Sequence, residues 1–230
     1  MRRFLLCSIL LLPVILLANT WKEGDRVEVL SKDKWFPGII QEVQEKGFLI
    51  NFDGYSDSFN EVVDAAKIRA AKPVDGISYI ATGLDGGAFR LKGNLKSGKI
   101  IRDLKWAERS DIACWPGIRN VEFQGKHLFY WFDLPDHSEA KITVKPLNGK
   151  RINLYVYAFD GKSVPPLKYP TRQCDAAHPA WIGQPDFSKP PEPQSLDVVA
   201  ITTRQMYAIG VAGAKGVEEG DFELTVEVKR

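Results

Sequence analysis

Apolar and polar residues alternate along much of the chain, and a period of two is typical of half-buried β-strands. The clearest example is the segment 222–228, in which apolar residues alternate with Glu223, Thr225 and Glu227. Similar stretches recur from Val27 onwards, separated by the Gly, Pro and Asp residues that favour turns. The pattern therefore predicts an all-β protein built from short antiparallel strands.

The first alternating segments lie between residues 21 and 70, around turn signals at Pro37-Gly38 and Asp53-Gly54. A few short strands in so small a segment favour a β-barrel, because closing a sheet removes its exposed edges. The segment 71–76 has the Pro, Gly and charged composition of a linker. We therefore predict a barrel over residues 19–70 and a linker over residues 71–76.

Further alternating segments run from residue 77 to the C-terminus, again separated by turn residues. Many short strands of this kind indicate an antiparallel β-sandwich, which we place over residues 77–230. A proline-rich stretch from Pro165 to Pro193 interrupts them and is long for a loop inside a compact domain. Loops of that length tend to have a function of their own.

The chain opens with Met1-Arg2-Arg3, followed by an apolar run over residues 4–17 and by Ala18. This order is typical of a secretory signal peptide. As a helix the run would span about 21 Å, short of the roughly 30 Å of a bilayer core. We predict cleavage after Ala18, with an uncleaved anchor as the alternative, and a secreted or periplasmic protein.

Export also changes the charge of the chain. The formal net charge is +2, and loss of Arg2 and Arg3 with the signal peptide brings it to zero. Nucleic-acid binding requires a clustered basic surface, so no nucleic-acid partner is expected. Outside the signal segment no apolar stretch reaches spanning length, so no membrane span is expected after its removal.

Two cysteines, Cys114 and Cys174, remain after the signal segment is removed. In an oxidising compartment an isolated pair of cysteines predicts a disulfide. The alternative is a catalytic thiol at Cys174, because Asp175 and His178 follow closely. Proximity in sequence does not establish such a pair, since catalytic Cys and His residues meet in space.

Motifs of known catalytic chemistry are missing from the sequence. The histidines His127, His137 and His178 have no partner at motif spacing, and there is no nucleophile elbow, zinc-protease motif or phosphate loop. Cys174 and His178 would supply only two of the four ligands of a structural zinc site. We therefore expect no enzyme, no cofactor and no metal, and note Asp53 and Asp57 as a weaker calcium alternative.

The first segment resembles a known family. The run from Lys34 to Ile40, the aromatic and glycine spacing over residues 52–63, and the closing Lys67-Ile68-Arg69 resemble the Tudor-type barrels, including chromo-barrel and Agenet domains. In that family several rings surround a methylated ammonium group by cation–π attraction. The resemblance implies cage candidates at Trp35, Phe52, Tyr55 and Phe59, although Phe52 and Phe59 could instead belong to the barrel core.

The later segments resemble a second family. The aromatic strand over residues 129–135, the segments 142–144 and 153–157, and the final pair over residues 206–211 and 220–226 are similar to the bacterial pre-peptidase C-terminal sandwich, itself similar to collagen-binding jelly rolls. That family acts as a non-catalytic accessory module of secreted proteins. The resemblance implies a jelly-roll-like sandwich without catalytic residues.

Five further aromatic residues are candidates for a surface that binds a ligand: Trp115, Tyr155, Tyr157, Phe159 and Trp181. An exposed row of rings could stack on sugars or on a partner protein, whereas the alternative is that a loop or the first domain covers them. Taken together, the sequence predicts a non-catalytic module that binds a protein or polysaccharide of the envelope or extracellular matrix. A structural or assembly protein of the cell envelope is the alternative.

Overall fold

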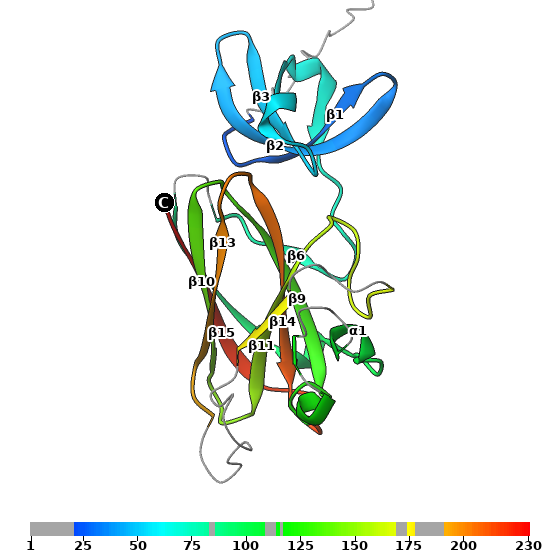
Figure 1. Ribbon diagram of the computed structural model, residues 1–230, viewed down its shortest axis with the longest axis vertical. Helices are drawn as coiled ribbons and strands as arrows, with labels where there is room; N and C mark the ends of the chain where they lie inside the picture. Colours follow the sequence, from blue (N-terminus) through cyan, green and yellow to red (C-terminus); the bar gives the residue numbers. More distant parts are fainter. Residues whose placement is uncertain (1–20, 83–85, 109–113, 116, 169–173, 178–190) are drawn as a thin grey trace, which may run out of the picture.

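The computed structural model describes residues 21–82, 86–108, 114–115, 117–168, 174–177 and 191–230. The predicted signal segment, Trp181 and His178 lie outside these ranges. A small curved sheet sits on one end of an elongated β-sandwich (Figure 1). Within the described ranges the only α-helix is the short α1, Lys105–Glu108, so the all-β prediction is confirmed.

The N-terminal sheet is a five-stranded antiparallel meander with the order β4-β3-β2-β1-β5. The register between β2 and β3 shifts between Ile40 and Glu42, and such a bulge bends a strand. The sheet thereby curls around a small apolar core that includes Val29, Ile40 and Ile50. Its elements are β1 (Arg26–Ser31), β2 (Lys34–Gln44), β3 (Gly47–Phe52), η1 (Asp57–Phe59), β4 (Glu61–Val63), η2 (Ala65–Lys67) and β5 (Ile68–Ala70).

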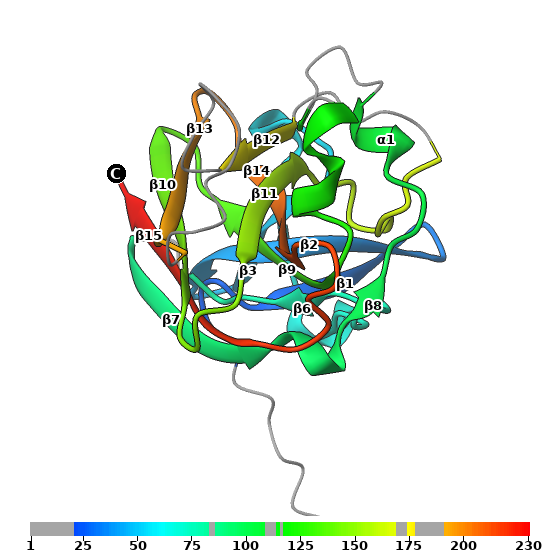
Figure 2. The same cartoon turned by 90° about the horizontal axis from the view of Figure 1, so that it is seen from below.

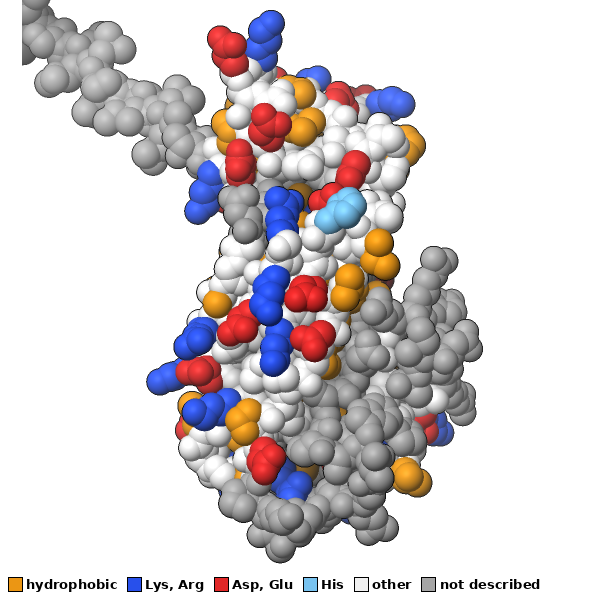
Figure 3. Space-filling model, turned by 60° about the vertical axis from the view of Figure 1, so that its left-hand side comes forward, with side chains coloured by type: hydrophobic (Ala, Val, Ile, Leu, Met, Phe, Trp, Pro, Cys, Tyr) orange, Lys and Arg blue, Asp and Glu red, His pale blue; other side chains and the backbone are white. Residues whose placement is uncertain are grey.

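One face of the sandwich is a four-stranded antiparallel sheet with the order β13-β10-β15-β7. Opposite charges stand across from one another on its outer side, for example Lys141 opposite Glu227 and Lys145 opposite Glu223. Figure 3 shows acidic and basic side chains interspersed on the side of the molecule that it faces, as expected for a solvated surface. The strands are β7 (Gly87–Asn94), β10 (Ser138–Pro146), β13 (Gln194–Ala200) and β15 (Asp221–Lys229).

The second face is a six-stranded sheet with the order β12-β11-β14-β9-β6, and β8 also pairs with β9. All its pairings are antiparallel except the one between β6 and β9. The elements of this part are β6 (Ser78–Tyr79), η3 (Leu95–Ser97), β8 (Lys99–Ile100), η4 (Gly117–Glu122), β9 (Lys126–Leu134), β11 (Ile152–Ala158), β12 (Cys174–Ala177) and β14 (Gln205–Gly213).

The sandwich has two apolar cores because the six-stranded sheet is covered on both sides. One core lies between the two sheets and includes Phe132, Ile142 and Leu224. The other lies on the outer side of the six-stranded sheet, beneath the segment that carries α1 and η4. Figure 2 shows α1 on the side of β11 and β14 that faces away from β10 and β13.

This second core corrects the expectation of an exposed aromatic row. Trp115, Tyr155, Tyr157 and Phe159 are all buried. The segment around α1 and η4, which includes Trp115, covers the Tyr155 and Tyr157 rings of β11, and Phe159 just after β11 belongs to the same core. Trp106 of α1, for instance, contacts both Tyr155 and Tyr157, with ring centroids 5.9 Å apart in each case. Of the alternatives considered from the sequence, burial of these four residues is correct, but their cover includes the segment around α1 and η4, which is neither the proline-rich loop nor the first domain.

A disulfide between Cys114 and Cys174 ties this cover to the sheet, as predicted. Cys174 lies on β12 opposite Tyr157 of β11, so the bond joins the covering segment to the edge of the six-stranded sheet. The bond also consumes the thiol that the catalytic alternative required. Within the ranges that the structure describes, no helix is long and apolar enough to cross a membrane.

Candidate functional site

Three aromatic side chains of the described residues are largely exposed: Trp35, Tyr55 and Phe59, at 37%, 50% and 62%. All three belong to the N-terminal sheet and its loops, and all three are among the four cage candidates. The large rings of the sandwich, by contrast, are mostly packed into its two cores. The exposed aromatic rings of the described residues therefore all lie on the N-terminal sheet and its loops.

Tyr55 and Phe59 lie together on the loop that joins β3 to β4. Their ring centroids are 5.7 Å apart in an edge-to-face arrangement. The buried Asn51 anchors this loop, since its amide nitrogen donates to Asp57 Oδ1 at 2.6 Å and to Asn60 Oδ1 at 3.0 Å. The pair is thus presented by an ordered loop rather than by a free one.

The other two cage candidates lie in different surroundings. The Phe52 ring packs against the barrel core and makes an edge contact with Phe36 at 6.5 Å, as the core alternative for Phe52 predicted. Trp35 carries the guanidinium of Arg69 over its ring, 3.8 Å from the centroid, and Arg69 also donates to Glu28 at 2.7 Å. One face of Trp35 is therefore occupied by a cation of the chain itself.

A cluster of four charges joins the barrel to the sandwich, and the sequence analysis did not identify it. Arg26 and Asp53 come from the barrel, and Asp133 and Arg204 come from the sandwich. Arg204 donates from Nε to Asn51 Oδ1 and from Nη2 to Asp53 Oδ1, both at 2.7 Å, and it pairs with Asp133 through Nη1. The side chains of all four charged residues are exposed by 10% or less.

The charges of this cluster compensate one another. Burial by itself would raise the pKa of Asp53, but the hydrogen bonds and charges of Arg26 and Arg204 outweigh it and hold that pKa below its usual value. Burial and the nearby carboxylate of Asp133 raise the pKa of Tyr79, which keeps its hydroxyl neutral. With two cations and two anions, the cluster has no net charge.

One sequence signal could have pointed to the cluster. Asp133 is a lone charge within the apolar run Phe129-Tyr130-Trp131-Phe132-Asp133-Leu134, and buried carboxylates are rare unless they are paired. Asp53, considered above with Asp57 as a calcium alternative, instead binds the two arginines, while Asp57 binds Asn51. In the described part of the chain no group of three or more acidic, His or Cys side chains could hold a metal ion.

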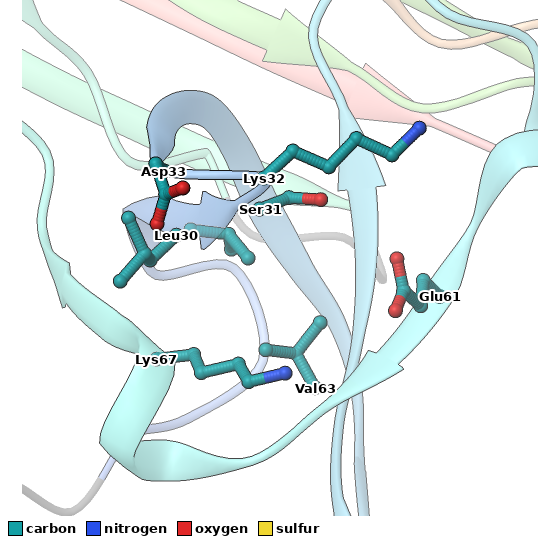
Figure 4. A pocket seen from close by; sticks show the side chains of 8 residues that line it. Leu30, Ser31, Lys32, Asp33, Glu61, Val63 and Lys67 are labelled. Atoms are coloured by element: carbon teal, nitrogen blue, oxygen red, sulfur yellow. The ribbon is translucent and has the colours of Figure 1, made fainter.

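Two hollows accompany these features. The first is a crevice of about 290 Å³ between the loop that carries Tyr55 and the turn around Arg204. The second, of about 240 Å³, lies in the barrel beside the turn that Lys32 and Asp33 form between β1 and β2. Figure 4 shows the side chains of Glu61 and Lys67 lining this second pocket. The charged residues that line this pocket are all exposed to solvent.

One family model matches part of this chain, and two solved structures are similar to it. Residues 24–73 match the family described as Agenet domain. A periplasmic inhibitor of g-type lysozyme from Aeromonas hydrophila is similar in structure, with 11% identity and a TM-score of 0.33, covering 66% of this chain and 96% of that one. A pre-peptidase C-terminal domain of a collagenase from Bacillus anthracis has 14% identity and a TM-score of 0.34, covering 69% and 99%.

No curated protein sequence matches this chain. The two resemblances drawn from the sequence, to Agenet-type barrels and to pre-peptidase C-terminal sandwiches, both recur among the comparisons. The N-terminal part of the chain, over residues 24–73, is thus similar to Agenet domains, and an antiparallel β-sandwich follows it.

Proposed function

We propose that this protein is an extracytoplasmic, non-catalytic binding module whose ligand contacts Tyr55 and Phe59. The observation that carries the proposal is the exposure of these two rings side by side on an anchored loop. Large rings give most stability when buried, and adjacent exposed rings are typical of surfaces that bind a partner. A protein or a polysaccharide of the envelope or extracellular matrix fits such a surface.

The surroundings of two strongly perturbed titratable groups, His127 and Tyr155, support a binding role over catalysis. Burial lowers the pKa of His127 to about 4, and burial also raises the pKa of Tyr155. These two residues lie in the second core and bond to each other, away from any surface that a substrate could reach. A catalytic site needs perturbed groups in an accessible cleft.

Export rests on two independent features. The segment over residues 1–18 has the order of a signal peptide, and the Cys114–Cys174 disulfide is typical of an oxidising compartment. We therefore place the protein outside the cytoplasm, either secreted or periplasmic.

The test compares the exported protein with a Tyr55→Ala/Phe59→Ala double variant. Each is immobilised and exposed to solubilised envelope and extracellular material, and its melting temperature is measured. We expect the double variant to lose the captured component while its melting temperature changes little, because both rings are largely exposed. Ile118→Ala, at an 86% exposed apolar residue of the sandwich, is the matched control and should capture normally.

Equal capture by the wild type and the double variant would refute the proposal. A double variant that unfolds would assign the two rings to packing and would favour the alternative of a structural envelope protein.

A further inference from the structure

The crevice between barrel and sandwich has a composition that restricts its ligand. The barrel contributes Phe52 and Tyr55 to its walls, and the sandwich contributes Phe159 and Met206. Its volume of about 290 Å³ lies near the lower end of the range for small-molecule sites, roughly 300–1,000 Å³. It has room for one ring of a ligand rather than for a folded partner.

Among the described residues that line the crevice, none carries an uncompensated charge. Arg204 is the only charged one of them, and its three guanidinium nitrogens already donate to Asn51, Asp53 and Asp133. A ligand carboxylate or phosphate would have to compete with two buried carboxylates for this guanidinium. A ligand cation would lie beside that guanidinium without an unpaired carboxylate among the lining residues. The crevice therefore favours an uncharged ligand.

Neutral polar groups surround the opening. Gln205 donates its amide nitrogen to Thr203 Oγ1 at 3.0 Å, and the Ser56 hydroxyl bonds to Ser58 Oγ at 2.7 Å. These contacts orient the groups without exhausting them, because a hydroxyl can make three hydrogen bonds and an amide oxygen can accept two. Ser56 and Gln205 are exposed, so both remain within reach of a ligand.

The apolar walls and the neutral rim together match one chemical class. A sugar ring has an apolar C–H face that stacks on an aromatic ring and a periphery of uncharged hydroxyl groups. The half-exposed ring of Tyr55 offers the stacking face, and Gln205, Thr203 and Ser56 offer partners for hydroxyls. We propose that this crevice binds an uncharged sugar ring of a polysaccharide, an inference that rests on the proposed binding function and names its ligand class.

The experiment measures binding of neutral tetrasaccharides to the exported protein by titration calorimetry. The probes are β-1,4-linked N-acetylglucosamine, β-1,4-linked glucose and α-1,4-linked glucose tetramers, with a polygalacturonate tetramer and a trimethyllysine peptide as charged probes. We expect at least one neutral tetramer to bind. Tyr55→Ala should then weaken its affinity by about tenfold through lost stacking. Gln205→Ala should weaken it by about fivefold through a lost hydrogen bond.

Gln124→Ala, an exposed glutamine that does not line the crevice, is the matched control and should leave the affinity unchanged. The inference is overturned if no neutral tetramer binds, if only a charged probe binds, or if Gln205→Ala has no more effect than Gln124→Ala. If capture of envelope material still depends on Tyr55 and Phe59 in that case, only the inference of sugar binding is wrong and the proposed binding function stands. If that capture is absent as well, the proposed function fails with it.

Discussion

Among single residues, Tyr155 organises the second core of the sandwich. Its ring is fully buried and makes edge contacts with Trp115 and Phe123 at 5.1 and 5.8 Å. His127 bonds both to the Tyr155 hydroxyl, at 2.9 Å from Nδ1, and to the carbonyl oxygen of Phe123, at 2.7 Å from Nε2. Because a carbonyl can only accept, Nε2 carries the proton and Nδ1 accepts from Tyr155.

This arrangement predicts how stability depends on pH. Burial lowers the pKa of His127 from 6.5 to about 4, so the unfolded chain binds a proton that the folded chain excludes between these values. Neutral His127 makes its full contribution to the free energy of unfolding above pH 6.5. As the pH falls towards 4, this contribution decreases by about 3 kcal/mol. The stability advantage of the wild type over His127→Gln should therefore shrink by this amount between pH 7 and pH 4 in urea unfolding.

The exposed His137 provides the comparison, since its side chain is 75% exposed. His137→Gln replaces an exposed imidazole and should change the free energy of unfolding at pH 7 by no more than about 0.5 kcal/mol. If the difference in the free energy of unfolding between the wild type and His127→Gln stays constant from pH 7 to pH 4, the predicted lowering of the His127 pKa is wrong.

Among the elements, strands with one buried face were the easiest to predict. β15 follows its alternating sequence, with Phe222, Leu224, Val226 and Val228 buried. The orientation of β11 is ambiguous in the sequence because both of its faces are apolar. Alternation alone therefore does not show which face packs between the two sheets and which is covered by another segment. The cover comes from the four-residue helix α1 and the turn η4, which are too short to show a helical period in the sequence.

In the candidate site, too, contacts between residues close in sequence could be predicted, whereas contacts between distant residues could not. The spacing of Tyr55 and Phe59 was enough to place both rings on one loop, because they are close in sequence. The contact of Arg69 with Trp35 and that of Arg204 with Asp53 join residues 34 and 151 positions apart. Such long-range pairs depend on how the sheets pack, which alternation alone does not specify.

The disulfide gives a prediction at this scale, because it closes a segment of 60 residues between the cover and β12. In the chain-entropy model a bond of this span stabilises the fold by about 4 kcal/mol. A Cys114→Ser/Cys174→Ser variant should lose stability of this order in urea unfolding. Wild-type protein treated with reductant is the control and should behave like the variant.

Thiol titration of the unfolded, unreduced exported protein checks the bond itself. We expect no free thiol, since Cys114 and Cys174 are the only cysteines beyond the signal segment. Two free thiols would contradict the disulfide and would restore the catalytic alternative for Cys174.

Across the whole molecule, the four-charge cluster of Arg26, Asp53, Asp133 and Arg204 joins the barrel to the sandwich. Arg26 pairs with Asp53 of its own sheet, lies 3.5 Å from Asp133, and places its guanidinium 4.9 Å from the ring centroid of Trp131. Each arginine thus contacts carboxylates of both parts. Since removing one member leaves a buried charge without compensation, the cluster should couple the unfolding of the two parts.

Replacing Arg204 by leucine tests this coupling. The variant leaves Asp53 and Asp133 to share Arg26, and breaking a buried ion network in this way costs roughly 3–5 kcal/mol. We expect scanning calorimetry to show one transition for the wild type and two for Arg204→Leu, with amide exchange in β1 and β3 accelerated in the variant. Arg69→Leu removes a partly exposed arginine that pairs with Glu28 inside the barrel sheet, and it should cost at most about 1 kcal/mol and keep a single transition. A single transition in Arg204→Leu, with exchange as slow as in the wild type, would mean that apolar contacts rather than these charges hold the barrel against the sandwich.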